Sequence, residues 1–184
     1  MIKLYFYKKG SDHTRDDTDR MIHTTLRRFR TETAQIGSES AADKTDSGSA
    51  PCVSIRRTPF GKPVLVGSPL FVGVTHTDTL AVIALSDVSF GIDCENGGRI
   101  VKRSERIAHR FFSDAERALL DACESAPERQ RLFLDIWVKK EAYVKYLGTG
   151  FRDLAKVDTC AADIHGHFEK IPHGDDILYV YTPV

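Results

Sequence analysis

Three carboxylates in the sequence could together form an all-oxygen site for a hard cation. Asp93 and Glu95 stand two positions apart at the end of an expected strand, where residues i and i+2 point to the same side. Glu141 lies further along the chain, and Lys145 follows it by four residues. Mg²⁺ prefers carboxylate, water and phosphate oxygens as ligands. We therefore predict a Mg²⁺ site that uses Asp93, Glu95 and Glu141.

Basic residues elsewhere in the chain would suit a polyphosphate held against such a metal. Lys62 and Pro63 belong to a Gly-Lys-Pro turn, and His76 follows Thr75 at the end of another expected strand. A metal polarises phosphoryl oxygens, and nearby cations offset the charge that develops during transfer. The residues alone indicate a Mg²⁺-dependent enzyme that acts on a diphosphate, and they leave the transferred group open.

A helix expected over residues 128–147 must carry Glu141 and Lys145 to that site. Trp137, Glu141 and Lys145 follow one another at intervals of four, beside an apolar sector of the same helix. The alternative is a plain i,i+4 Glu–Lys pair, worth roughly 0.2–0.5 kcal/mol on a helix surface. The catalytic interpretation is favoured because Asp93 and Glu95 give Glu141 a metal to share. The apolar sector consists of Phe133, Ile136, Tyr143, Val144 and Leu147.

Two further helices are expected between the acidic strand and this long helix. The first covers residues 99–112 and carries four arginines on one side, which either form a solvated face or meet an anionic partner. The second begins at a capping box of Ser113 and Glu116 and runs to about residue 123. Capping explains Glu116, and a further role for its carboxylate is the second possibility. The four arginines are Arg99, Arg103, Arg106 and Arg110.

The remaining chain is expected to be mostly strand. Residues 31–51 contain no aromatic residue and are rich in small and polar types, so we expect a mobile insertion there. After residue 150, alternating polar and apolar residues predict a closing antiparallel meander. The expected strands are 2–7, 53–57, 71–76, 80–85, 88–94, 153–158, 164–171 and 177–181, and a helix is expected at 16–30.

The composition excludes several classes of protein. Hydrophobic residues make up 41% and charged residues 28%, as in ordinary soluble globular proteins. With 26 basic and 26 acidic residues, the formal net charge of zero argues against a general nucleic-acid or membrane-surface binder. Four widely spaced cysteines fit a reducing cytoplasm. Because no apolar run approaches the ~20 residues that span a bilayer and no signal peptide is recognisable, we expect a cytoplasmic protein.

The order and separation of these motifs resemble the 4′-phosphopantetheinyl transferases. The resemblance rests on residues 90–95 (FGIDCE), then 110–113 (RFFS), then 137–145 (WVKKEAYVK). The chain length and the upstream Gly-Lys-Pro and Thr-His motifs make it similar to the larger, surfactin-synthetase-activating (Sfp-like) class. The small trimeric holo-acyl-carrier-protein synthases are single lobes. The resemblance covers residues 53–151 well and the N-terminal region only in outline.

The resemblance implies an α+β, pseudo-twofold fold of two similar α/β lobes. Each lobe would have a small antiparallel sheet packed on a long helix, with the N-terminal lobe at 1–86 and the C-terminal lobe at 87–184. Coenzyme A and Mg²⁺ would bind in the cleft between them. The chain would work as a monomer, with an apo acyl carrier protein or peptidyl carrier domain as its partner and with neither nucleic acid nor membrane.

The resemblance also implies roles for the residues singled out above. The three carboxylates would hold Mg²⁺ against the coenzyme A pyrophosphate, and Lys145 would contact the phosphates. Trp137 would pack against the pocket, and the four arginines would face an acidic carrier-protein helix. Arg15 and Arg20 are candidates for further phosphate contacts, and Thr75 stands where the family often has serine. The adenosine 3′-phosphate end would be bound by Lys62, Pro63, Thr75 and His76.

The implied reaction is the transfer of 4′-phosphopantetheine to a serine of the carrier, with release of adenosine 3′,5′-bisphosphate. Glu141, Glu116 or a water on the metal could accept the serine proton, and the sequence does not choose among them. It also leaves open which carrier is modified. Two other classes compete: a non-catalytic module that binds carrier proteins or coenzyme A, and a Mg²⁺ phosphoesterase.

Overall fold

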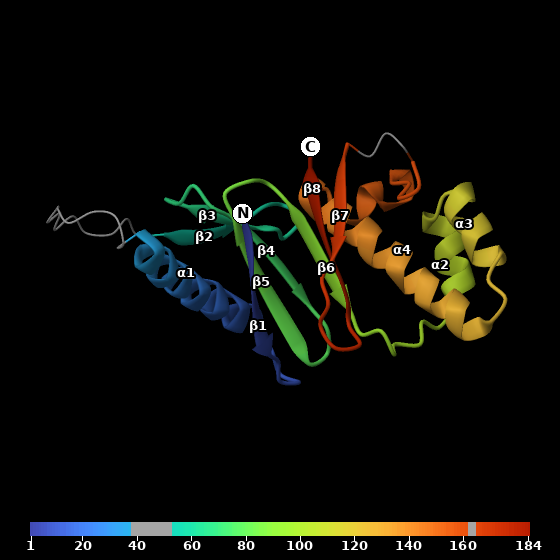
Figure 1. Ribbon diagram of the computed structural model, residues 1–184, viewed down its shortest axis with the longest axis horizontal. Coiled ribbons are helices and arrows are strands. Elements are labelled where there is room, and N and C mark those ends of the chain that lie inside the picture. The colour runs from blue at the N-terminus through green and yellow to red at the C-terminus, as the bar shows by residue number, and fades with distance from the viewer. Residues whose placement is uncertain (38–52, 162–164) are drawn as a thin grey trace, which may run out of the picture.

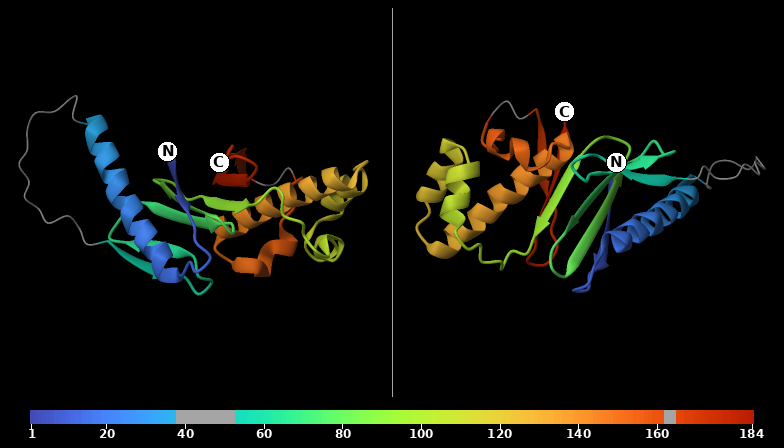
Figure 2. Two further views of the ribbon diagram at one scale, coloured as in Figure 1. Left: turned by 90° about the horizontal axis from the view of Figure 1, so that it is seen from below. Right: turned by 180° about the vertical axis from the view of Figure 1, so that it is seen from behind.

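The N-terminal half of the molecule is built on a three-stranded sheet whose apolar residues form much of the core. The computed structural model describes residues 1–37, 53–161 and 165–184. The first sheet is antiparallel in the order β1-β5-β4, and its central strand β5 is buried along its whole length. Helix α1 lies along this sheet (Figures 1 and 2). Its residues Ile22 and Leu26 share a core cluster with Ile83 and Leu85 of β5. The elements of this half are β1 (Ile2–Lys8), α1 (Arg15–Gly37), β2 (Ser54–Arg57), β3 (Pro63–Val66), β4 (Phe71–His76) and β5 (Leu80–Ser86).

The C-terminal half is built around one long helix, α4. It begins after the N-cap Ser125 and ends at Gly148, whose backbone is left-handed (φ 72°), as the expected glycine stop requires. Its buried face includes Phe133, Ile136 and Val144, as predicted, whereas Leu147 is exposed. The sheet order is β6-β8-β7. The elements are β6 (Gly91–Glu95), α2 (Ser104–Phe111), α3 (Asp114–Asp121), α4 (Ala126–Leu147), the 3₁₀ helix η1 (Gly150–Lys156), β7 (Gly166–Lys170) and β8 (Ile177–Pro183).

The two halves repeat one topology. The first runs β1-α1-β4-β5, with the β2–β3 hairpin inserted, and the second runs β6-α4-β7-β8, with α2 and α3 inserted. In both sheets the last strand lies between the first strand and the strand that precedes it in the chain. The predicted α+β, pseudo-twofold fold is therefore confirmed. The proposed lobe boundary at residues 86/87 falls between β5 and β6.

Three expected elements differ clearly from the structure, and the strand expected at 88–94 begins only at Gly91. Helix α1 continues to Gly37, so the first part of the expected mobile insertion is helical, and residues 38–51 lie outside the described residues. The arginine helix begins only at Ser104, because Arg103 has left-handed backbone (φ 62°) that cannot continue a helix. The segment expected as a strand at 153–158 forms most of η1, with Leu154 buried against α4.

The described residues contain no helix that combines the length and the hydropathy needed to cross a bilayer.

Candidate active site

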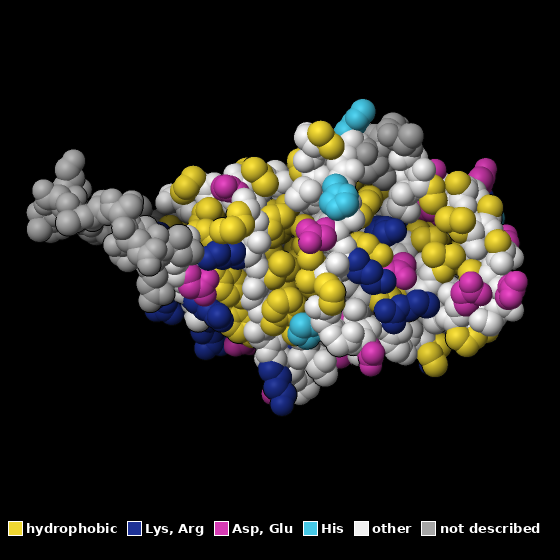
Figure 3. All heavy atoms as spheres, in the orientation of Figure 1, with side chains coloured by type: hydrophobic (Ala, Val, Ile, Leu, Met, Phe, Trp, Pro, Cys, Tyr) yellow, Lys and Arg dark blue, Asp and Glu magenta, His cyan; other side chains and the backbone are white. Residues whose placement is uncertain are grey.

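A cavity of about 400 Å³ opens where the two lobes meet. It is lined by the start of α1, the β2–β3 turn, β4, β6 and the end of α4. Within the described residues no acidic side chain lines it. On the face in Figure 3, hydrophobic side chains gather between the lobes and Lys and Arg side chains lie on both sides of them. The basic lining residues are His13, Arg15, Arg57, Lys62, His76 and Lys145.

Lys145 connects this cavity to the first predicted metal ligand. Its Nζ donates to Asp93 Oδ1 at 2.5 Å, and the hydroxyl of Thr75 donates to the same oxygen at 3.0 Å. The Asp93 side chain is 5% exposed, whereas that of Lys145 is 37% exposed. A buried carboxylate needs such compensation, since an unpaired charge is costly to bury. One ammonium therefore neutralises Asp93 and also faces the cavity.

The pKa of Glu141 is raised to about 7, first by burial and then by the negative charge of Asp93. The charge of Glu95 raises it further, while Lys145 and Arg99 lower it. The three predicted metal ligands are thus close enough for their charges to oppose one another. A divalent cation would relieve that repulsion, which makes this oxygen donor set chemically suited to Mg²⁺.

The side chains do not form a ready-made metal cage. Among residues 1–37, 53–161 and 165–184, no three His, Cys, Asp or Glu side chains are arranged to hold a metal ion. Asp93 is paired with Lys145, and Glu95 accepts a hydrogen bond from Arg99. The predicted use of Asp93, Glu95 and Glu141 as metal ligands therefore stays a prediction.

A glycine places the acidic strand directly under α4. A Cβ at Gly91 would lie 1.9 Å from the carbonyl oxygen of Ala142, so only glycine permits this contact. Ala142 itself is fully buried. Glu141 and Lys145 flank this point of contact along α4, and this proximity lets them act on Asp93, two residues beyond Gly91.

Lys62, Pro63 and His76 all line the cavity, and their predicted contact with a 3′-phosphate stays a prediction. Lys62 Nζ donates to the carbonyl oxygen of Tyr146 at 2.9 Å, near the C-terminal end of α4. Burial lowers the pKa of Lys62. Burial, followed by the charges of Lys9 and Lys145, lowers the pKa of His76. An anion bound beside either group would favour its charged form and so oppose this lowering of the pKa.

Two other predicted residues lie away from the cavity lining. Trp137 packs among Phe111, Phe133 and Phe151, with ring centroids 6.1–6.5 Å apart. Thr75 is 1% exposed and faces Asp93. Neither lines the cavity. Both residues pack against other side chains near the cavity without lining it.

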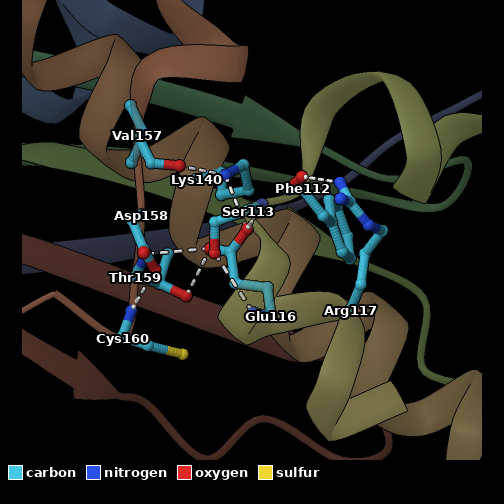
Figure 4. A network of polar contacts seen from close by, with 9 residues as sticks. All are labelled: Phe112, Ser113, Glu116, Arg117, Lys140, Val157, Asp158, Thr159 and Cys160. Carbon is cyan, nitrogen blue, oxygen red and sulfur yellow. Dashed lines mark hydrogen bonds and ion pairs between the residues drawn. The ribbon is translucent and has the colours of Figure 1, made fainter. Parts of the chain in front are cut away.

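Glu116 forms the predicted capping box and also the centre of a buried network (Figure 4). Its Oε2 accepts from Ser113 N and Lys140 Nζ, and its Oε1 accepts from Thr159 N and Oγ1, all at 2.8 Å. Glu116 and Lys140 are both 0% exposed, and Lys140 also donates to Val157 O. Because a carboxylate offers about four lone-pair positions, all of them are used.

The sequence reasoning missed Arg57 and His13 as lining residues. Arg57 is opposite Pro63 in the β2–β3 hairpin, which places it beside Lys62. Arg57 could have been found by predicting a hairpin around the Gly-Lys-Pro turn, because the register of a hairpin sets which residues face each other across the turn. Of the two N-terminal candidates, Arg15 lines the cavity and Arg20 pairs with Asp17 instead.

The geometry defines a two-lobed α+β protein with a basic cavity between its lobes and carboxylates behind one wall. Residues 89–177 match the model of the 4′-phosphopantetheinyl transferase superfamily. This segment makes up most of the C-terminal lobe, and it is similar to the superfamily that the sequence motifs resemble.

Curated relatives agree with this assignment. The 4′-phosphopantetheinyl transferase HetI of Nostoc sp. is 33% identical over 103 residues, which cover 53% of this chain and 43% of that protein. The 4′-phosphopantetheinyl transferase AcpT of Salmonella typhi is 32% identical over 105 residues, or 54% of this chain and 52% of the relative. The 4′-phosphopantetheinyl transferase psf-1 of Bacillus pumilus is 37% identical over 92 residues, which cover 49% of this chain and 37% of that protein. The matched segments thus span about half or less of these relatives.

Proposed function

We propose that this protein transfers 4′-phosphopantetheine from coenzyme A to a serine of an apo acyl or peptidyl carrier protein, as a holo-acyl-carrier-protein synthase type of enzyme. The by-product would be adenosine 3′,5′-bisphosphate. One observation carries the proposal: the cavity is lined by six basic or histidine side chains, one of which, Lys145, is bonded to buried Asp93. Coenzyme A has a 3′-phosphate and a pyrophosphate, which suit such a lining.

Each lobe would bind a different part of coenzyme A. Arg57, Lys62 and His76 of the first lobe would bind the 3′-phosphate end. Lys145 of the second lobe would contact the pyrophosphate and hold the reacting phosphorus in place. Asp93, Glu95 and Glu141 would hold Mg²⁺, and when bound the metal would polarise the phosphoryl oxygens.

Glu141 or a water on the metal would accept the proton of the carrier serine. In the metal-free protein the pKa of Glu141 is raised to about 7, and a cation bound to this carboxylate would lower it. Glu116 was the other carboxylate considered, and its oxygens already accept four hydrogen bonds within a fully buried network. Glu116 therefore supports the site from a distance.

The carrier protein is proposed to approach α2. Arg106 and Arg110 are four residues apart on this helix and both are exposed. Two cations on one side of a helix favour an acidic partner surface. Both walls of the cavity come from one chain, which is why we propose a monomer, and coenzyme A as substrate fits a cytoplasmic setting.

The test is a mass measurement on apo carrier proteins of the fatty-acid, polyketide and nonribosomal-peptide types. Incubation with the enzyme, coenzyme A and Mg²⁺ should add the mass of one phosphopantetheine to the carrier serine. Asp93→Ala and Glu141→Ala should each abolish the gain while circular dichroism stays unchanged.

Three results would contradict the proposal. Folded enzyme that modifies none of the carriers would exclude this transfer. Coenzyme A binding by calorimetry without turnover would indicate a binding module. Release of phosphate or nucleotide without a carrier would indicate a phosphoesterase.

A further inference from the structure

Thr75 joins the edge strands of the two lobes by a pair of buried hydrogen bonds. Strand β4 is an edge of the first sheet and β6 is an edge of the second, and the two lie side by side in Figures 1 and 2. The Thr75 hydroxyl donates to Asp93 Oδ1 and accepts from Cys94 N, each at 3.0 Å. One hydroxyl from the first lobe thus contacts both a side chain and the backbone of the acidic strand.

The neighbouring residues of β4 show that this contact is built into the strand. Gly73 lies two residues before Thr75, on the same side of the strand. A Cβ at Gly73 would lie 2.6 Å from the ring of Phe90 and 2.8 Å from Ile92. The absence of a side chain at Gly73 lets β4 approach β6 closely enough for the short Thr75 side chain to reach Asp93.

The same geometry separates Thr75 from the coenzyme A cavity. Adjacent residues of a strand point to opposite faces, so Thr75 and His76 cannot present their side chains to one phosphate. His76 is exposed and lines the cavity, whereas Thr75 is 1% exposed and does not. The expected contact of Thr75 with the 3′-phosphate therefore has no support in this arrangement.

We infer that Thr75 is a positioning residue for Asp93 and that it acts across the lobe interface. This inference rests on the proposed function, because it takes Asp93 as a ligand of the Mg²⁺ that the reaction uses. Thr75 and Lys145 both donate to Oδ1, and no hydrogen bond within the described residues uses Oδ2. The hydroxyl fixes the rotation of the carboxylate, so that Oδ2 keeps one direction for a cation.

Removing the hydroxyl would free this rotation and also orphan a backbone donor. Hydrogen bonds to charged groups contribute more than neutral ones, and a buried N–H without an acceptor adds a further cost. The first loss weakens the preorganisation of Asp93 for a metal. The second loosens β6 next to the same residue, since Cys94 N would lose its acceptor.

The test compares Thr75→Val, which keeps the shape and removes the hydroxyl, with Thr75→Ser, which keeps the hydroxyl. Calorimetric titration with Mg²⁺ alone should show about tenfold weaker binding for Thr75→Val, by the loss of one charge-assisted hydrogen bond. The dissociation constant for coenzyme A, measured in EDTA, should change less than twofold. Thr75→Ser should restore Mg²⁺ affinity to within about twofold of the original protein.

Any other pattern of affinities in the folded variants would overturn the inference. If Thr75→Val weakens coenzyme A in EDTA tenfold and leaves Mg²⁺ affinity unchanged, Thr75 is a ligand of coenzyme A. If Thr75→Ser is as impaired as Thr75→Val, the methyl packing matters and the hydroxyl does not. Should Thr75→Val fail to fold, Thr75→Ala carries the same expectations. The Mg²⁺ titration needs no carrier, so failure of the transferase proposal would be seen separately, in the mass measurement.

Discussion

At the scale of single residues, the site pairs the ammonium of Lys145 with the carboxylate of Asp93, and a bound phosphate and a bound cation could each take the place of one partner. Asp93 is buried and compensated by Lys145, while Glu141 nearby has a pKa raised to about 7. Lys145 responds in the other direction: burial alone would lower its pKa, but the charges of Asp93 and Glu141 outweigh that effect and raise it. The ammonium is therefore fully charged at neutral pH and available to a phosphate at the cavity.

Glu141 gives a pH-dependent prediction. A carboxyl whose pKa is higher in the folded than in the unfolded protein binds extra protons when folded, so the free energy of unfolding of the metal-free protein should fall as pH rises from about 4.5 to about 7. A cation must displace the remaining proton. Mg²⁺ binding at pH 6 should therefore release protons, and affinity should increase with pH and level off above about 7.

Calorimetry in two buffers with different ionisation enthalpies measures this release directly. Glu141→Gln should abolish this proton release and should remove the contribution of Glu141 to the fall in the free energy of unfolding over that window. Equal enthalpies in both buffers at pH 6, with measurable Mg²⁺ binding, would contradict the proposed role of Glu141.

At the scale of elements, the buried Glu116–Lys140 pair fastens three segments together. Glu116 belongs to α3, Lys140 to α4, and Thr159 and Val157 to the chain after η1. Lys140 directly precedes Glu141, so the network holds the part of α4 that bears the reacting residues. Sequence reasoning found the capping box of Glu116, but the wider network depends on Thr159, which is 43 residues away and which no local pattern marks.

Breaking this pair should be costly. Lys140→Met leaves the Glu116 carboxylate buried without its cation, and we expect a loss of about 3–5 kcal/mol in the free energy of unfolding. The double variant Lys140→Met with Glu116→Gln removes both charges and should regain part of that loss. Urea unfolding of the three proteins measures both effects.

Lys156→Met is the matched control, because the Lys156 side chain is 76% exposed and pairs with Asp153 at the surface. Its effect should stay below about 0.5 kcal/mol. A similar small change for Lys140→Met would mean that the buried pair does not fasten α3 to α4.

At the scale of the whole molecule, the sequence predicted the two lobes but not how they meet. The family resemblance implied the two lobes, and periodicity located most of their strands and helices, although the expected strand at 153–158 is a 3₁₀ helix. The interface between the lobes depends on which edge strands of the two sheets face each other, and periodicity does not predict this pairing. In the sequence Gly73 has no feature that distinguishes it within its strand, and Thr75 was expected to bind the adenosine 3′-phosphate end, although both residues permit the contact of β4 with β6.

The cavity between the lobes also predicts that an anionic ligand should stabilise the whole molecule. Lys62, on the first lobe, already reaches Tyr146 O at the end of α4. A ligand that binds only the folded state raises the melting temperature, and at a given concentration the rise grows with the logarithm of its affinity. Coenzyme A should therefore raise it more than 3′-dephospho-coenzyme A does, because the 3′-phosphate adds a contact with the Lys62 side of the cavity.

Lys62→Met should remove most of this difference between the two ligands, and Lys156→Met, which lies outside the cavity lining, should keep it. Differential scanning fluorimetry at low and high salt provides the measurement. The difference should shrink with salt, because screening weakens contacts between charges that water can reach. Equal stabilisation by both compounds in the original protein would place the 3′-phosphate away from Lys62 and would require another orientation of the ligand across the two lobes.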